Sequence, residues 1–150
     1  MKRTIWFDMD GTIANLYADD NWLGKLRSYD PSPYAEAEVM LNMSLLARYL
    51  NKLQKLGYWI GIISWASKDS TKESDEAVAD NKRKSLATHL ASVEFDFTLI
   101  TAYGVPKELW MNTTDDILFD DNEEIRGEWD GEAHKPNEIL SVLKELIDRG

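Results

Sequence analysis

Residues 5–12 read Ile-Trp-Phe-Asp-Met-Asp-Gly-Thr, an apolar run that leads directly into two acids and a glycine. The apolar run predicts a buried strand. Alternate side chains of a strand share a face, so Asp8 and Asp10 start out pointing the same way. Gly11 allows a sharp turn with a positive φ. Two carboxylates this close repel each other, and a hard cation such as Mg²⁺ relieves the repulsion. Taken alone, the stretch also fits a strand-to-turn junction with solvated acids.

Short apolar segments alternate with helical ones along the rest of the chain. Apolar runs predict strands at residues 4–8, 59–63, 97–100 and 117–119. Apolar residues at three- and four-residue spacing predict helices at residues 35–56, 75–90 and 137–148, and a shorter helix covers 106–111. Residues 122–136 are polar and are predicted to be irregular. This order is typical of an α/β fold in which a Rossmann-like parallel sheet is flanked by helices.

The length and charge of the chain restrict its function. A chain of 150 residues predicts a single domain over 1–150. The net charge of −10 disfavours binding of long nucleic acid, but a bound metal can still attract a small phosphorylated ligand. The absence of cysteine excludes disulfides and thiolate metal sites. Because no apolar stretch reaches membrane-spanning length, we expect a soluble cytoplasmic protein with no membrane partner.

Polar side chains follow the predicted strands at their carboxyl ends: Asp8, Asp10, Ser64, Asp120 and Asp121, with Lys107 opening the helix ahead of the last strand. In parallel sheets, ligands bind beyond the carboxyl ends of the strands. Acids around a metal ion, with a hydroxyl and an ammonium nearby, suit a phosphate group. A carboxylate there can attack phosphorus and form an aspartyl phosphate.

The order of these motifs resembles the haloacid dehalogenase (HAD) superfamily of phosphohydrolases, and the resemblance covers residues 4 to about 126. It implies a HAD-like core in which Asp8 is the nucleophile. Asp10 would be the general acid and base, with its backbone carbonyl on Mg²⁺. Ser64 would hydrogen bond the transferring phosphoryl group and Lys107 would bridge Asp8 and the phosphate. The Mg²⁺ ligands implied are Asp8, Asp10, Asp120 and Asp121.

The lysine of this motif set has two alternative positions. Lys82 belongs to a basic Lys-Arg-Lys patch on a predicted helix, where a solvated face is the usual explanation. Lys107 lies thirteen residues before Asp120, in the turn that leads to the last catalytic strand, and is favoured.

The substrate is the least determined feature of the sequence. The insertion at about 13–38 is too short for a large cap domain and predicts a small flap. The opening Asp-Met-Asp-Gly-Thr-Ile-Ala-Asn, with aromatic residues in the insertion, resembles the 5′(3′)-deoxyribonucleotidases of the superfamily, in which insertion aromatics stack on the base. The substrate-binding candidates are Gly11, Thr12, Asn15, Tyr17, Trp22 and Trp65. Packing of the flap onto the core explains Trp22 equally well.

The leading prediction is therefore an Mg²⁺-dependent phosphomonoesterase that acts through an aspartyl phosphate on a nucleotide or a similar small phosphometabolite. One alternative is a phosphatase that processes 3′-phosphate ends of nucleic acid, which an open site permits and the acidic charge disfavours. The other is a HAD-like module that binds a metabolite or partner without turnover.

Overall fold

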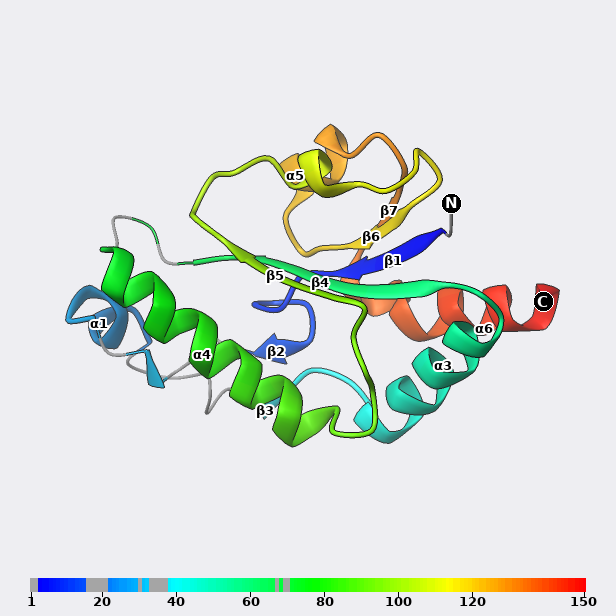
Figure 1. Ribbon diagram of the computed structural model, residues 1–150, viewed down its shortest axis with the longest axis horizontal. Coiled ribbons are helices and arrows are strands. Elements are labelled where there is room, and N and C mark those ends of the chain that lie inside the picture. Colours follow the sequence, from blue (N-terminus) through cyan, green and yellow to red (C-terminus); the bar gives the residue numbers. More distant parts are fainter. Residues whose placement is uncertain (1–2, 16–21, 30, 33–37, 67, 69–70) are drawn as a thin grey trace.

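The computed structural model describes residues 3–15, 22–29, 31–32, 38–66, 68 and 71–150. Its main sheet has five strands in the order β5-β4-β1-β6-β7. Their bounds are β1 Thr4–Phe7, β4 Trp59–Trp65, β5 Phe97–Thr101, β6 Ile117–Phe119 and β7 Glu132–His134. All neighbouring pairs are parallel. The predicted fold class, a parallel α/β sheet flanked by helices, is confirmed (Figure 1).

Helices cover both faces of this sheet (Figure 1). Three long helices lie on one face: α3 Met43–Lys55, α4 Lys72–His89 and α6 Ile139–Arg149. The short helix α5 Glu123–Glu128 and the 3₁₀ turn η2 Lys107–Trp110 lie on the other face, and a second 3₁₀ turn, η3 Pro136–Glu138, leads into α6. None of the helices in the described part of the chain has the length and apolar character of a bilayer span.

Alternation along the strands divides the core into two layers. Ile5 and Phe7 of β1 pack with the long helices, through residues such as Leu50 and Leu143. The intervening Trp6 packs on the opposite face, with Leu118, Ile125 and Trp129 among its neighbours. Because both faces of the sheet are covered along the central strands β4, β1 and β6, these strands are mostly apolar rather than alternating, which is why they were recognisable in the sequence.

The region between β1 and α3 differs from its prediction. A continuous helix over 35–56 is wrong, because Glu38–Val39 form a strand, β3, which pairs antiparallel with β2 Ala14–Asn15. The Asn42 side chain then accepts from the backbone N–H of Leu45 and caps the start of α3. A further short helix, α1 Trp22–Arg27, lies in this insertion. Its role as a flap stays a prediction.

Residues 122–136 were predicted to be irregular, and this is also wrong, because they contain α5 and the edge strand β7. The helix was overlooked because it is short, although Asn122 is a good capping residue and accepts from the backbone N–H of Ile125. The strand carries charged and small residues at a sheet edge, where burial imposes little apolar pattern.

Candidate phosphate and metal site

Three adjacent strands bring the predicted site residues to one edge of the sheet. Phe7 at the end of β1 is in register with Ile62 of β4 and with Phe119 at the end of β6. The backbone N–H of Asp8 donates to the Phe119 carbonyl at 2.9 Å, so the chain leaves β1 directly beside β6. The side chains that follow these register positions are Asp8, Asp10, Ser64, Asp120 and Asp121.

Asp8, Asp120 and Asp121 form an acidic cluster. One carboxylate oxygen from each lies within 4.8 Å of the others. Asp8 and Asp120 are buried, at 7% and 1% exposure, whereas Asp121 is exposed. Carboxylate oxygens are hard ligands, and Mg²⁺ is ordinarily held by one or two carboxylates together with water and phosphate oxygens. The donor set therefore fits a divalent cation of this kind.

Burial and mutual repulsion disfavour the charged forms of these acids. Burial and the charge of Asp8 raise the pKa of Asp120, although Lys107 opposes the change. Partial desolvation of its carboxyl group, the charge of Asp8 and a hydrogen bond with Asp8 raise the pKa of Asp121 from 3.8 to about 7, although the residue as a whole is exposed. A divalent cation would offset the negative charge of these carboxylates and so favour their ionised forms.

Lys107 lies among the same acids. Its Nζ donates to Asp8 Oδ1 at 3.1 Å and to Asp120 Oδ2 at 2.6 Å. Burial alone would lower the pKa of Lys107, but attraction to Asp8 and Asp120 raises it. The side chain therefore stays charged beside the predicted nucleophile, where an ammonium also attracts phosphoryl oxygens.

Lys82 forms a second buried contact set, and its interpretation as part of a solvated basic face is wrong. Its side chain is fully buried, and Nζ donates to Asp10 Oδ2 at 2.9 Å, Ser64 Oγ at 2.6 Å and the Trp65 carbonyl at 2.7 Å. The Asp10 side chain keeps 18% exposure. Burial raises the pKa of Asp10, while Lys82 opposes the change. The sequence offered Lys82 and Lys107 as alternatives, whereas the structure places both beside the acids of the candidate site.

The turn after β1 supports this arrangement. Gly11 has a φ of 78°, as predicted for a sharp turn, and its backbone N–H donates to the Ala14 carbonyl at 2.8 Å. The Thr12 hydroxyl donates to Asp8 Oδ2 at 3.2 Å and is 1% exposed. As placed here, the Thr12 side chain orients Asp8, and its contact with a substrate stays a prediction.

Trp65 lies directly beside Lys107. Its indole N–H donates to the Val105 carbonyl at 2.7 Å, and the Lys107 ammonium lies 5.5 Å from its ring centre. Tyr103 packs against the same ring at 5.0 Å, tilted by 58°, and is 53% exposed. Sequence reasoning missed Tyr103, because an aromatic residue in a loop carries no periodic signal that would place it next to Trp65.

The remaining substrate candidates belong to the insertion. Asn15 is half-buried in β2 and is paired with Glu38. The backbone of Trp22 begins α1. Tyr17 lies outside the described residues, so its prediction stays open.

Two residues that sequence reasoning missed hold the Asp120 loop. The Arg126 guanidinium donates to the Asp120 carbonyl at 2.9 Å, and the Asn122 backbone N–H donates to Asp120 Oδ1 at 3.0 Å. Asn122 caps the start of α5, and Arg126 lies in its last turn. Recognition of that helix from its Asn-Glu-Glu opening would have indicated this second layer of contacts.

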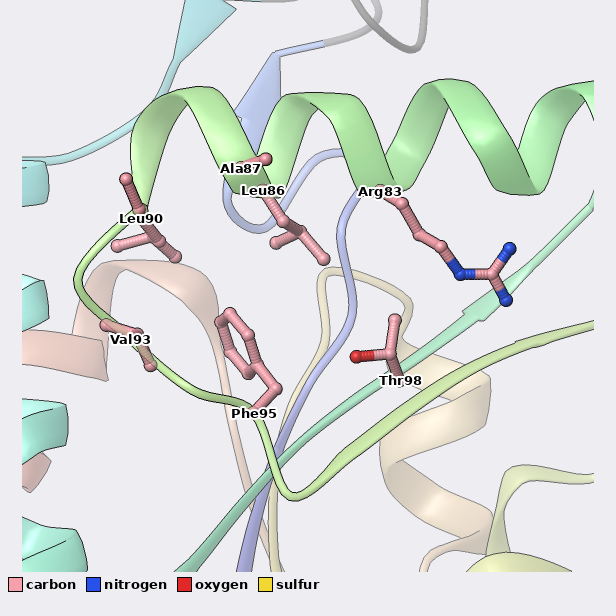
Figure 2. Close-up of a pocket in the computed structure, with 8 residues that line it drawn as sticks. Arg83, Leu86, Ala87, Leu90, Val93, Phe95 and Thr98 are labelled. Carbon is pink, nitrogen blue, oxygen red and sulfur yellow. The ribbon is translucent and has the colours of Figure 1, made fainter.

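A separate pocket lies away from the acids, between the second half of α4 and the start of β5. It has a volume of about 380 Å³ and is lined by Arg83, Leu86, Ala87, Leu90, Ala91, Val93, Phe95 and Thr98. Figure 2 shows Leu86, Leu90, Val93 and Phe95 around one hollow, with the Arg83 guanidinium at its far end. It contains none of the residues that surround Asp8.

The sequence matches no protein-family model. No curated protein matches it. Among solved structures, the chain is similar to a D,D-heptose 1,7-bisphosphate phosphatase from Burkholderia thailandensis, with 17% sequence identity and a TM-score of 0.48. The match covers 82% of this chain and 68% of that one. A likeness this distant says nothing about substrate.

Proposed function

We propose that this protein is an Mg²⁺-dependent phosphomonoesterase of the HAD type, with Asp8 as its nucleophile. The observation that carries the proposal is the grouping of Asp8 with Asp120 and Asp121, within 4.8 Å, beside the buried ammonium of Lys107. Lys107 neutralises only part of this acidic charge. A metal ion and a phosphate group together would complete the charge balance of such a site.

The metal would be held by Asp8, Asp120 and Asp121, together with the backbone carbonyl of Asp10. When bound, it offsets the negative charge of the phosphoryl oxygens, so that a carboxylate can approach phosphorus. Asp120 is well placed for this role, because contacts from Lys107, Asn122 and Arg126 fix its side chain and its carbonyl.

The reaction then takes place in two steps. A carboxylate oxygen of Asp8 attacks phosphorus, the bond from phosphorus to the ester oxygen breaks, and protonated Asp10 gives its proton to that oxygen. A water molecule next attacks the aspartyl phosphate, Asp10 takes a proton from the water, and inorganic phosphate leaves Asp8 ionised. Burial, which raises the pKa of Asp10, favours the protonated form that the first step needs.

The substrate that we propose is a small phosphorylated metabolite, with nucleoside monophosphates as the first class to test. Exposed Tyr103 and the Trp65 ring beside Lys107 offer a surface on which a planar base can stack. Processing of nucleic-acid ends receives less support, because the net charge of −10 opposes binding of a polyanion.

The test is phosphate release from nucleoside monophosphates, sugar phosphates and a 3′-phosphorylated oligonucleotide, each measured with Mg²⁺ and with EDTA. We expect metal-dependent release from small monoesters and none in EDTA. Release from the oligonucleotide alone would favour end processing. No release from any of these substrates would favour the non-catalytic binding module.

A further inference from the structure

We propose that Lys82 is a positioning residue that fixes the Asp10 carboxyl and the Ser64 hydroxyl relative to each other, so that Asp10 can protonate the leaving group. This inference rests on the proposed function. Lys82 comes from α4, 72 positions along the chain from Asp10 and 18 from Ser64, and reaches both from a fully buried position. A buried ammonium is costly unless it is fully hydrogen bonded, so its contacts must be specific.

The geometry separates the roles of the two lysines. An ammonium has three N–H donors, and within the described part of the chain Lys82 Nζ donates to Asp10 Oδ2, Ser64 Oγ and the Trp65 carbonyl, all within 2.9 Å. These contacts direct its protons to the protein. Lys107 contacts the nucleophile Asp8 instead. Lys82 therefore acts through Asp10 and Ser64, whereas Lys107 lies next to the reacting phosphoryl group.

The contacts of Lys82 orient the polar groups of both partners. Ser64 accepts from Lys82 through Oγ, so its own hydroxyl proton is available to donate to a phosphoryl oxygen. Asp10 is held through Oδ2, which leaves Oδ1 outside the Lys82 contact, and the side chain remains 18% exposed. A carboxyl held by one oxygen can present the other to the ester oxygen in a constant direction.

How much the reaction needs protonation of the leaving group depends on the ester that is hydrolysed. An alkyl phosphate has a poor leaving group that needs the proton of Asp10, whereas p-nitrophenolate leaves without one. The ratio kcat/KM includes only steps up to departure of the leaving group, so it isolates this requirement. Loss of Lys82 should therefore reduce kcat/KM strongly for an alkyl phosphate and weakly for p-nitrophenyl phosphate.

The experiment compares Lys82→Met with Lys84→Met, a matched control at an exposed position on the same helix. With saturating Mg²⁺, Lys82→Met should lower kcat/KM about 100-fold for an alkyl phosphate and less than about tenfold for p-nitrophenyl phosphate. Lys84→Met should change neither value. The Mg²⁺ affinity of Lys82→Met, measured by calorimetry, should stay at the wild-type value because Lys82 contacts none of the three clustered acids.

Equal losses for both esters, or no loss for either, would overturn the assignment of Lys82 while leaving the phosphatase intact. Wild-type protein that releases no phosphate from either ester would instead overturn the proposed function, and this assignment with it. If Lys82→Met fails to fold, Lys82→Arg replaces it. Arginine keeps the charge and the donors but cannot match the compact ammonium, so the same selective loss for the alkyl ester is expected, and its absence counts against the proposal.

Discussion

Strand β6 has a buried aspartate at each end, and the two carboxylates are held in different ways. Asp116, before the strand, accepts from the backbone N–H groups of Thr4 and Asn112, the Trp6 indole and the Thr113 hydroxyl, at 2.7 to 3.1 Å. Asp120, after the strand, contacts the Lys107 ammonium and lies within 4.8 Å of two other acids. Both residues are at most 1% exposed.

The difference shows that burial of a carboxylate does not by itself identify a functional site. Asp116 is surrounded by neutral donors that satisfy both of its oxygens, so the contacts account for it as a structural residue that joins β1 to β6. Asp120 is surrounded by charges that do not cancel, which is the condition that a metal ion or a phosphate relieves. Substitutions at the two ends of the sheet should therefore have different effects, on turnover at one end and on stability at the other.

The largest effect is expected for Asp8, the proposed nucleophile at the carboxyl end of the sheet. Asp8→Asn should lower kcat by about 10⁴-fold or more, because an amide cannot form the aspartyl phosphate. Its circular dichroism and melting temperature should stay close to wild type, since the change removes a charge from a repulsive cluster. Turnover near the wild-type rate would remove Asp8 as nucleophile.

A substitution of Asp116, at the amino end of β6, should affect the stability of the fold rather than turnover. Asp116→Asn places amide hydrogens against groups that are themselves donors, and each buried donor left without an acceptor costs about 1–3 kcal/mol. We expect the free energy of unfolding in urea to fall by about 2–4 kcal/mol, with kcat unchanged at temperatures where the variant is folded. A loss of kcat as large as that of Asp8→Asn would contradict the division of roles.

The raised pKa values of the clustered acids should make the stability of the protein depend on pH. The pKa of Asp121 is about 7 in the folded protein against 3.8 for the unperturbed group, and burial also raises the pKa values of Asp10 and Asp120. Between pH 3.8 and about 7, Asp121 binds more protons in the folded state than in the unfolded state, so the free energy of unfolding falls as pH rises. The melting temperature in EDTA should therefore be lower at pH 8 than at pH 5, and Mg²⁺ should restore it at pH 8.

Asp121→Asn is the control for this effect. The variant lacks the carboxyl group whose pKa is raised to about 7, so its melting temperature in EDTA should fall less between pH 5 and pH 8 than that of the wild type. An unchanged slope would mean that other groups determine the pH dependence, and no stabilisation of the wild type by Mg²⁺ at pH 8 would count against the metal site.

The smallest effect is expected at the rim of the site. Tyr103→Ala removes an exposed ring that packs on Trp65. If a base stacks there, KM for a nucleoside monophosphate should rise about fivefold or more, since stacking contributes about 1–3 kcal/mol. KM for a sugar phosphate should not change. Equal KM changes for both substrates would show that Tyr103 only supports the loop.

The sequence predicted the main elements of the sheet because their signals are strong. Buried parallel strands are apolar throughout, and an amphipathic helix such as α3 repeats its apolar positions regularly. The prediction failed at β3, α5 and β7, which are short, and two of the three lie at sheet edges, where burial leaves little pattern. The site prediction was hardest for Lys82, because α4 is polar on most of its surface and a lysine within it resembles a solvated residue.

By itself, the sequence determined that acids, a hydroxyl and a lysine follow successive strands, because the order of residues fixes what stands at each strand end. Only the tertiary structure decided how these groups pair. It placed Asp116 among neutral donors, Asp120 among charges, and both lysines in one buried site. Those assignments depend on which strands are neighbours and on how far a side chain reaches across the sheet edge. Contacts between residues separated by 72 and 99 positions are set by the packing of distant elements against one another.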